Sequence, residues 1–234
     1  MNGTPLRFVF DPIGDELAAA LECEAEVFLE TYGNTLDQLA FEYEPYADST
    51  GCMTLLDEKG RALATSRFIA PGPAGLKTLN DTRNRPWHVD GLRSARAAGI
   101  DPSRTWDVAT IAVRRSSGRG SLPAAALYHG IAAAAHANNV ESIVMIMDAR
   151  ARRLLSAVGL QTHALPGTAE GEYLGSPRST PLWAHLREMF GLQRQANPDA
   201  YRLIYQGIGL DGVSLPTDWT WHRSHLTSPD PAYA

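Results

Sequence analysis

The sequence predicts a mixed α/β domain in which a central sheet of about six or seven strands has helices on both faces. The main observation is a strand–turn–helix–strand order over residues 107–147, whose second strand, residues 140–147, is almost entirely apolar. A strand that is apolar throughout is buried on both faces, as in a parallel βαβ unit with a right-handed crossover. The chain has 234 residues, 44% of them hydrophobic, which suits one enlarged domain.

Before this unit, strands and helices alternate. We expect a strand at residues 6–10, helices at 15–32 and 36–46, and strands at 52–56 and 62–69. The two strands are joined by Asp57-Glu58-Lys59-Gly60, a sequence typical of hairpin turns. Residues 71–99 contain several prolines and glycines and predict an irregular insertion over one face of the sheet, with a helix at 91–98.

The βαβ unit comprises a strand at 107–113, a turn at 114–120, a helix at 121–138 and a strand at 140–147. A short helix at 149–158 and a strand at 160–165 follow, then a helix at 181–192 and a last strand at 201–206. We assign residues 1–210 to one domain and 211–234 to a tail packed on it. Trp219 and Trp221 in the tail are expected to cover exposed apolar surface.

The composition excludes several classes of function. A formal net charge of −5, from 21 basic and 26 acidic residues without a lysine-rich tract, argues against a nucleic-acid partner. No apolar run approaches the ~20 residues that cross a bilayer, and the first residues are too polar for a secretory signal. Cys23 and Cys52 lack metal-ligand spacing and read as reduced and structural. We expect a cytoplasmic protein; its oligomeric state is open.

The turn between strand and helix carries the clearest functional signal. Its residues are Val113, Arg114, Arg115, Gly118, Arg119, Gly120 and Ser121, with serines at 116 and 117. Glycines leave room for a ligand, and the following helix directs backbone N–H groups and the positive end of its dipole into the turn. Arginines bind anionic oxygens, and Ser121 is a suitable N-cap. These residues form a cradle for a pyrophosphate or phosphopantetheine group. The alternative is an ordinary connection with solvated arginines.

The segment from Arg115 to Gly120 resembles the pyrophosphate-binding pattern Gln/Arg-x-x-Gly-x-Gly/Ala of the GNAT acyltransferases. The later Val158-Gly159-Leu160 step also fits, so the resemblance covers residues 106–165. It implies a GNAT-like sheet and a coenzyme A or phosphopantetheine thioester as acyl donor, with no permanently bound cofactor and no metal.

Other residues are similar to the acyl-homoserine-lactone (autoinducer) synthases and the long-chain N-acyl amino acid synthases. These residues are Val27-Phe28, the strand that ends with Arg67-Phe68-Ile69, and Trp106-Asp107. Those enzymes carry an arginine where Arg67 stands and a Trp-Glu-x-Ser-Arg run on the strand before the cradle. Here Asp107 replaces the glutamate and Thr110 the last arginine, which counts against a lactone-forming acceptor.

The resemblance implies transfer of an acyl group from acyl-CoA or an acyl carrier protein to the amine of an amino acid-like small molecule. Two alternatives stay open. One is an acetyl-CoA-dependent N-acetyltransferase of a small amine or protein. The other is an inactive module that binds acyl thioesters.

Five residues are candidates for the chemistry. Asp107 could take the amine proton, or merely pair with Arg67 or Arg104; Thr110 could donate to the oxyanion, or simply favour a strand. Glu172 is a further catalytic candidate and Glu170 a substrate-binding one, although both also fit solvated loop charges. Arg67 could bind an acceptor carboxylate or form a surface ion pair.

Histidines and methionines give weaker signals. His129 and His136 lie seven residues apart on one helix face and read as a packed or solvent-facing pair rather than a metal site. His163 is an alternative base. Met145 and Met147 belong to the core or line an acyl tunnel.

Overall fold

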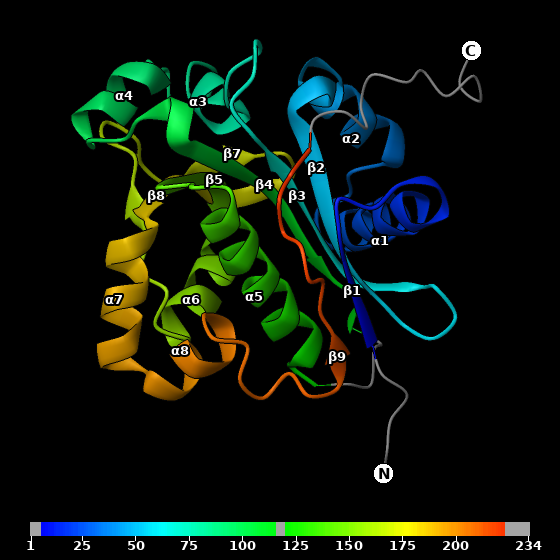
Figure 1. Ribbon diagram of the computed structural model, residues 1–234. Coiled ribbons are helices and arrows are strands. Elements are labelled where there is room, and N and C mark those ends of the chain that lie inside the picture. The colour runs from blue at the N-terminus through cyan, green and yellow to red at the C-terminus, as the bar shows by residue number, and fades with distance from the viewer. Residues whose placement is uncertain (1–5, 116–119, 223–234) are drawn as a thin grey trace.

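A computed structural model describes residues 6–115 and 120–222. Within them, nine strands form one mixed sheet in the order β6-β8-β5-β4-β3-β2-β1-β9, and β7 pairs with β8 (Figure 1). The strands are β1 Leu6–Phe10, β2 Thr50–Leu56, β3 Ala62–Ile69, β4 Thr105–Val113, β5 Ser142–Asp148, β6 His163–Ala164, β7 Gly171–Tyr173, β8 Ser176–His185 and β9 Val213–Ser214. The mixed α/β class is confirmed. The sheet has more strands than the expected six or seven, and three of them, β6, β7 and β9, are only two or three residues long.

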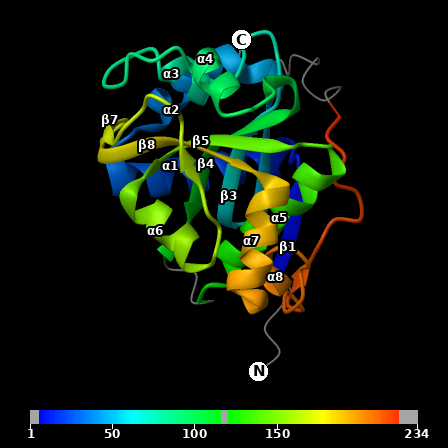
Figure 2. The ribbon, with the colours of Figure 1, turned by 90° about the vertical axis from the view of Figure 1, so that its left-hand side faces the viewer.

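The helices cover both faces of the sheet, as expected. They are α1 Gly14–Tyr32, α2 Leu36–Tyr43, α3 Lys77–Asp81, α4 Gly91–Ala97, α5 Leu122–Ala137, α6 Ala149–Ala157, α7 Leu186–Ala196 and α8 Pro198–Ile204. The main core joins α5, α7 and α8 to one face of the sheet, and separate clusters join α1 and α2 to the other. The short helices α3 and α4 lie over one end of the sheet in both views (Figures 1 and 2).

The predicted βαβ unit is confirmed. Strands β4 and β5 run parallel in the register Thr105↔Ser142 to Asp107↔Val144, with α5 between them in sequence. The antiparallel β2–β3 hairpin is confirmed as well; its turn is closed by hydrogen bonds from Gly60 N to Asp57 O (3.0 Å) and from Lys59 N to the Asp57 carboxylate (2.9 Å).

Two predictions for the C-terminal third are wrong. Residues 181–185 belong to β8, not to a helix, because the whole of β5 from Ser142 to Asp148 pairs with this strand. Residues 201–204, predicted as a strand, belong to α8. Aromatic and branched residues favour strands, but Asn197 caps this helix by accepting a hydrogen bond from Ala200 N (3.1 Å), and Pro198 occupies its first turn.

Residues 211–222, the described part of the tail, cross the α5 face of the sheet. Strand β9 pairs in parallel with β1, and the Trp219 ring lies 5.3 Å from the Phe8 ring and that of Trp221 5.6 Å from the Phe68 ring. The two tryptophans therefore cover apolar core residues, as the sequence predicts. Among the described residues, no helix combines the length and apolarity that a membrane span requires.

Two irregularities of β4 shape the site. The β3–β4 register passes from Arg67↔Thr110 to Phe68↔Val108, so Ala109 is an extra, bulged residue. As a result Asp107 and Thr110, three residues apart, lie on the same face, the one covered by α1–α3. In addition, β4 continues to Val113 and β5 to Asp148, but their pairing stops at Asp107 and Val144. The two strands are thus splayed toward the cradle, as expected.

Candidate active site

The splayed strands open onto two cavities. The larger, of about 90 Å³, lies on the α1 side and is bordered by β4, β5, α1, α2, α6 and the β7–β8 turn. The smaller, of about 40 Å³, lies on the α5 side and has an almost wholly apolar lining. Val108 and Ile111 line both cavities. The gap between β4 and β5 therefore separates a polar chamber from an apolar one.

The described part of the cradle lies where the splayed end of β4 meets the start of α5. Val113 ends β4, Arg115 is exposed, and Gly120 has a positive φ of 59°, a conformation that favours glycine. Ser121 occupies the N-cap position of α5 but makes no side-chain capping hydrogen bond there. Gly118 and Arg119 lie outside the described residues. The binding roles of the cradle residues stay predictions.

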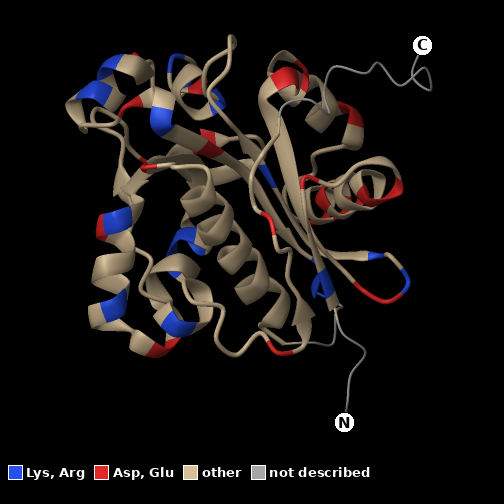
Figure 3. Ribbon diagram, in the orientation of Figure 1, with Lys and Arg blue, Asp and Glu red and all other residues tan. Residues whose placement is uncertain are grey.

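Arg114 points away from the start of α5. It is buried, donates to the Ala62 carbonyl (2.9 Å) and pairs with Glu26 of α1 (2.5 Å). Its charge is therefore balanced inside the α1 side of the sheet, so Arg114 is not part of the phosphate-binding arrangement that we propose below. Figure 3 shows several acidic positions, in red, along the α1 ribbon.

A buried network joins Thr110, Arg67 and Glu24. The Thr110 hydroxyl donates to Glu24, and the Arg67 guanidinium makes a two-pronged contact with the same carboxylate, with 3.0 Å from Nε to Oε1. Glu24 is 3% exposed. Burial alone would lower the pKa of Arg67, but the charge of Glu24 raises it above its ordinary value. Arg67 therefore forms a buried ion pair, and neither a surface pair nor a free carboxylate-binding group.

Glu24 is not among the residues predicted from the sequence. A signal was present, because Glu24 lies four residues after Ala20 and four before Phe28, on the helix face that packs against the sheet. A carboxylate on such a face needs a buried partner, and Arg67 on the neighbouring strand was available.

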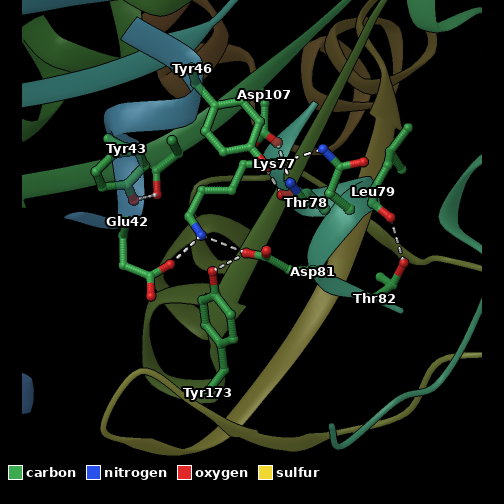
Figure 4. A network of polar contacts seen from close by, with 12 residues as sticks. Glu42, Tyr43, Tyr46, Lys77, Thr78, Leu79, Asp81, Thr82, Asp107 and Tyr173 are labelled. Carbon is green, nitrogen blue, oxygen red and sulfur yellow. Dashed lines mark hydrogen bonds and ion pairs between the residues drawn. The ribbon is translucent and has the colours of Figure 1, made fainter. Parts of the chain in front are cut away.

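Asp107 belongs to a second network, around α3 (Figure 4). Its carboxylate accepts hydrogen bonds from Thr78 N (2.5 Å) and the Thr78 hydroxyl (2.9 Å). Arg67 and Arg104, its alternative partners, pair with Glu24 and Glu141 instead. Asp107 is fully buried and does not line the larger cavity. Its contacts hold α3 against β4, and its part in proton transfer stays a prediction.

Lys77, which precedes Thr78 in α3, is buried together with two carboxylates. Its ammonium contacts Glu42 (2.6 Å) and Asp81 (2.7 Å), and the Tyr173 hydroxyl donates to Asp81 (2.5 Å; Figure 4). The Tyr173 ring lines the larger cavity. The network thus fixes one wall of the cavity and leaves the lysine charge fully balanced.

Glu170 and Glu172 lie outside both cavities. Glu170 is exposed and pairs with Arg178 (2.7 Å), and Glu172 is exposed on β7. The structure places both near the chamber, since Tyr173 follows directly, but not in its lining. Their assigned roles stay predictions.

The histidines take packed or exposed positions. His129 is buried against the Ile204 carbonyl (3.0 Å), and His163 is exposed and lies against the Trp183 ring. Among residues 6–115 and 120–222, no group of three potential ligands for a metal ion occurs. Met145 lines the smaller cavity and Met147 the larger, and both belong to the buried core. Their place in an acyl tunnel stays a prediction.

The burial of Asp107 leads to a first prediction. Burial raises the pKa of Asp107 from 3.8 to about 7, so between these values the folded chain keeps a proton that the unfolded chain releases. This contribution to stability is full below pH 3.8 and is lost as the pH rises toward 7, at about 1.4 kcal/mol per pH unit. We expect Asp107→Asn, which cannot ionise, to lack this loss.

Urea unfolding of both proteins at pH 5, 6, 7 and 8 measures the effect. The stability of the variant relative to the wild type should increase by roughly 2–3 kcal/mol between pH 5 and 7 and level off above that. A difference that does not change with pH would show that Asp107 is not protonated in the folded state.

Comparisons with known proteins agree with this geometry. No family model matches the chain, and no curated protein matches it significantly. Solved structures do match, and they show a fold shared with AHL synthases, an N-acyl amino acid synthase and a putative N-acetyltransferase, which is the GNAT-like fold.

Three of these structures are particularly informative. The AHL synthase LasI is 15% identical, with a TM-score of 0.56 over 79% of this chain and 91% of its own. The N-acyl amino acid synthase FeeM, from uncultured soil microbes, is 14% identical, with a TM-score of 0.60 over 81% and 95%. The CoA-dependent acyl-homoserine lactone synthase BjaI, with SAM and isopentyl-CoA, is 12% identical, with a TM-score of 0.55 over 92% and 94%. At these identities the likeness concerns the fold.

Proposed function

We propose that this chain is a cytoplasmic N-acyltransferase that moves an acyl group from a coenzyme A or carrier-protein thioester to the amine of a small molecule. One observation carries the proposal: β4 and β5 part beyond Asp107 and Val144, and the gap opens onto a polar and an apolar cavity. A thioester needs this combination, because its acyl chain is apolar and its carbonyl must meet an amine.

In this proposal the phosphates of the donor bind at the start of α5, where backbone N–H groups and the helix dipole favour an anion. The exposed Arg115 adds positive charge, and so do Arg150, Arg152 and Arg153 of α6, a helix whose Ala151 borders the larger cavity (Figure 3). The pantetheine arm lies between β4 and β5, and the acyl chain enters the apolar cavity beside Met145.

The reaction then needs a hydrogen-bond donor for the oxyanion and a sulfur that can depart as a thiolate. A β-bulge leaves its extra residue outside the regular ladder, so the backbone N–H of Ala109 suits the developing oxyanion. The amine forms a bond to the thioester carbon as the C–S bond breaks. The thiol has an ordinary pKa of about 8.5, so the thiolate leaves without a dedicated acid. Leu155, where many acetyl-CoA-dependent relatives of this fold place a tyrosine, is buried and apolar.

A thiol-release assay with a matrix of donors and amines tests the proposal. Acetyl-CoA, octanoyl-CoA and octanoyl carrier protein should each be paired with amines and amino acids. We expect octanoyl donors to exceed acetyl-CoA in kcat/KM, because only the longer chain reaches the apolar residues that line the smaller cavity. A preference for acetyl-CoA would favour an acetyltransferase, and donor binding without thiol release from any pair would favour a binding module.

A further inference from the structure

The larger cavity has a lining suited to a cation. Four aromatic rings face it, those of Phe28, Tyr32, Tyr43 and Tyr173, together with the carboxylate of Asp148. Within the described part of the chain, no lysine, arginine or histidine lines this cavity. Aromatic faces and a carboxylate attract an ammonium group, and the same surroundings repel an anion.

The buried cations behind this lining are already balanced. Arg67 is held by Glu24, and its guanidinium lies 4.4 Å from the centre of the Tyr43 ring. Lys77 contacts Glu42 and Asp81 and lies behind the same ring, at 5.6 Å. A second carboxylate brought in by a ligand would have to displace one of these partners or stay unpaired, and an unpaired buried charge is strongly unfavourable.

Hydrogen bonds hold the Asp148 carboxylate in place, and it can accept one further hydrogen bond. One oxygen caps α6 by accepting from Arg150 N (2.7 Å) and Ala151 N (3.0 Å), and the other accepts from the Tyr32 hydroxyl. A carboxylate offers about four acceptor positions, so one remains for a ligand. Burial, followed by the bond to Asp148, raises the pKa of Tyr32, which keeps this hydroxyl a donor.

From these contacts we propose that the acceptor is a small amine without a carboxylate, such as a diamine or an amino alcohol, bound through Asp148 and the rings of Phe28 and Tyr32. The inference rests on the proposed function and narrows its acceptor from an amino acid-like molecule to a cationic amine. The bound ammonium passes a proton to Asp148, directly or through water. The neutral amine then attacks the thioester carbon, a C–N bond replaces the C–S bond, and the departing thiolate takes up the second proton that the attacking nitrogen loses.

Substrate pairs that differ only in the carboxylate test the proposal on the unaltered protein. With octanoyl-CoA as donor, cadaverine should exceed lysine, and ethanolamine should exceed serine, by at least tenfold in kcat/KM. Equal or better use of the amino acids overturns the inference and leaves the proposed acyl transfer intact. Thiol release from none of the four overturns the proposed function itself.

A variant pair assigns the effect to Asp148. Asn is also a good N-cap, so Asp148→Asn keeps α6 capped and removes the charge, with an amide nitrogen in place of the oxygen that accepts from Tyr32. We expect its kcat/KM for cadaverine to fall at least tenfold, with octanoyl-CoA affinity unchanged. Asp90→Asn is the matched control, because Asp90 caps α4 through the same pair of backbone bonds and is exposed. It should leave kcat/KM unchanged.

A variant of Arg150 tests the opposite possibility, that the site binds an acceptor carboxylate. It is exposed at the start of α6 and acts electrostatically on Tyr32. If lysine were the better substrate and Arg150→Ala removed that preference, an acceptor carboxylate would be bound at the mouth of the cavity, and the proposal would be wrong.

Discussion

Replacement of Glu24 by alanine is expected to lower the free energy of unfolding by about 3–5 kcal/mol, the cost of removing one partner of a buried ion pair. The Arg67 side chain is only 12% exposed, so its guanidinium would lose its counter-ion without gaining water. The Thr110 hydroxyl would lose its acceptor in the same step. Urea unfolding at neutral pH measures the change.

Two controls make the result specific. Glu30→Ala, at an exposed position of the same helix, should change stability by about 0.5 kcal/mol or less. Glu24→Gln retains an oxygen for Thr110 and should fall between the two. If Glu24→Ala and Glu30→Ala behaved alike, the buried network would not hold α1 against β3 and β4.

Replacement of Ala151 by phenylalanine is expected to lower kcat/KM for acyl transfer by about 100-fold or more, because its ring would enter the larger cavity and displace the reacting groups by more than an ångström. Ala151 is only partly buried, in the first turn of α6, so the fold should tolerate the larger side chain. Thiol release with octanoyl-CoA and a diamine measures the loss.

Ala157→Phe is the matched control, since Ala157 ends the same helix and is exposed. Thermal unfolding of both variants separates loss of activity from loss of structure. Full activity of a folded Ala151→Phe protein would show that the reaction does not take place in this cavity.

The sequence predicts the central fold well because its strongest signals are local. Residues adjacent in the sequence are enough to indicate three of the elements: the apolar strand at 140–147, the alanine-rich helix before it and the hairpin turn at Asp57–Gly60. Register and bulges depend on contacts far away in sequence. The bulge at Ala109, which brings Asp107 and Thr110 to one face, follows from pairing with β3 and has no signal within β4 itself.

The C-terminal third shows where local signals mislead. Pro181 resembles a helix start, but β5 pairs along its whole length with residues 179–185 and draws them into the sheet. Similarly, Tyr201 and its neighbours favour a strand by composition, whereas the cap at Asn197 and packing against α5 make them helical.

The candidate site was predicted only in part. The cradle, Arg67, Asp107 and Thr110 were found because they lie in short motifs. Glu24 and Tyr32 of α1 and Asp148 of β5 were not, because their partners lie on elements that meet only in the folded chain. Charge balance was equally hidden: whether Arg67 can bind a substrate depends on Glu24, 43 residues earlier.

A crystal structure with bound octanoyl-CoA tests the central claim most directly. The thioester arm should lie between the parted ends of β4 and β5, with its phosphates at the start of α5 near Gly120 and its acyl chain in the apolar cavity beside Met145. Unaltered, empty cavities with the donor bound elsewhere, for example between α5 and α7, would contradict it.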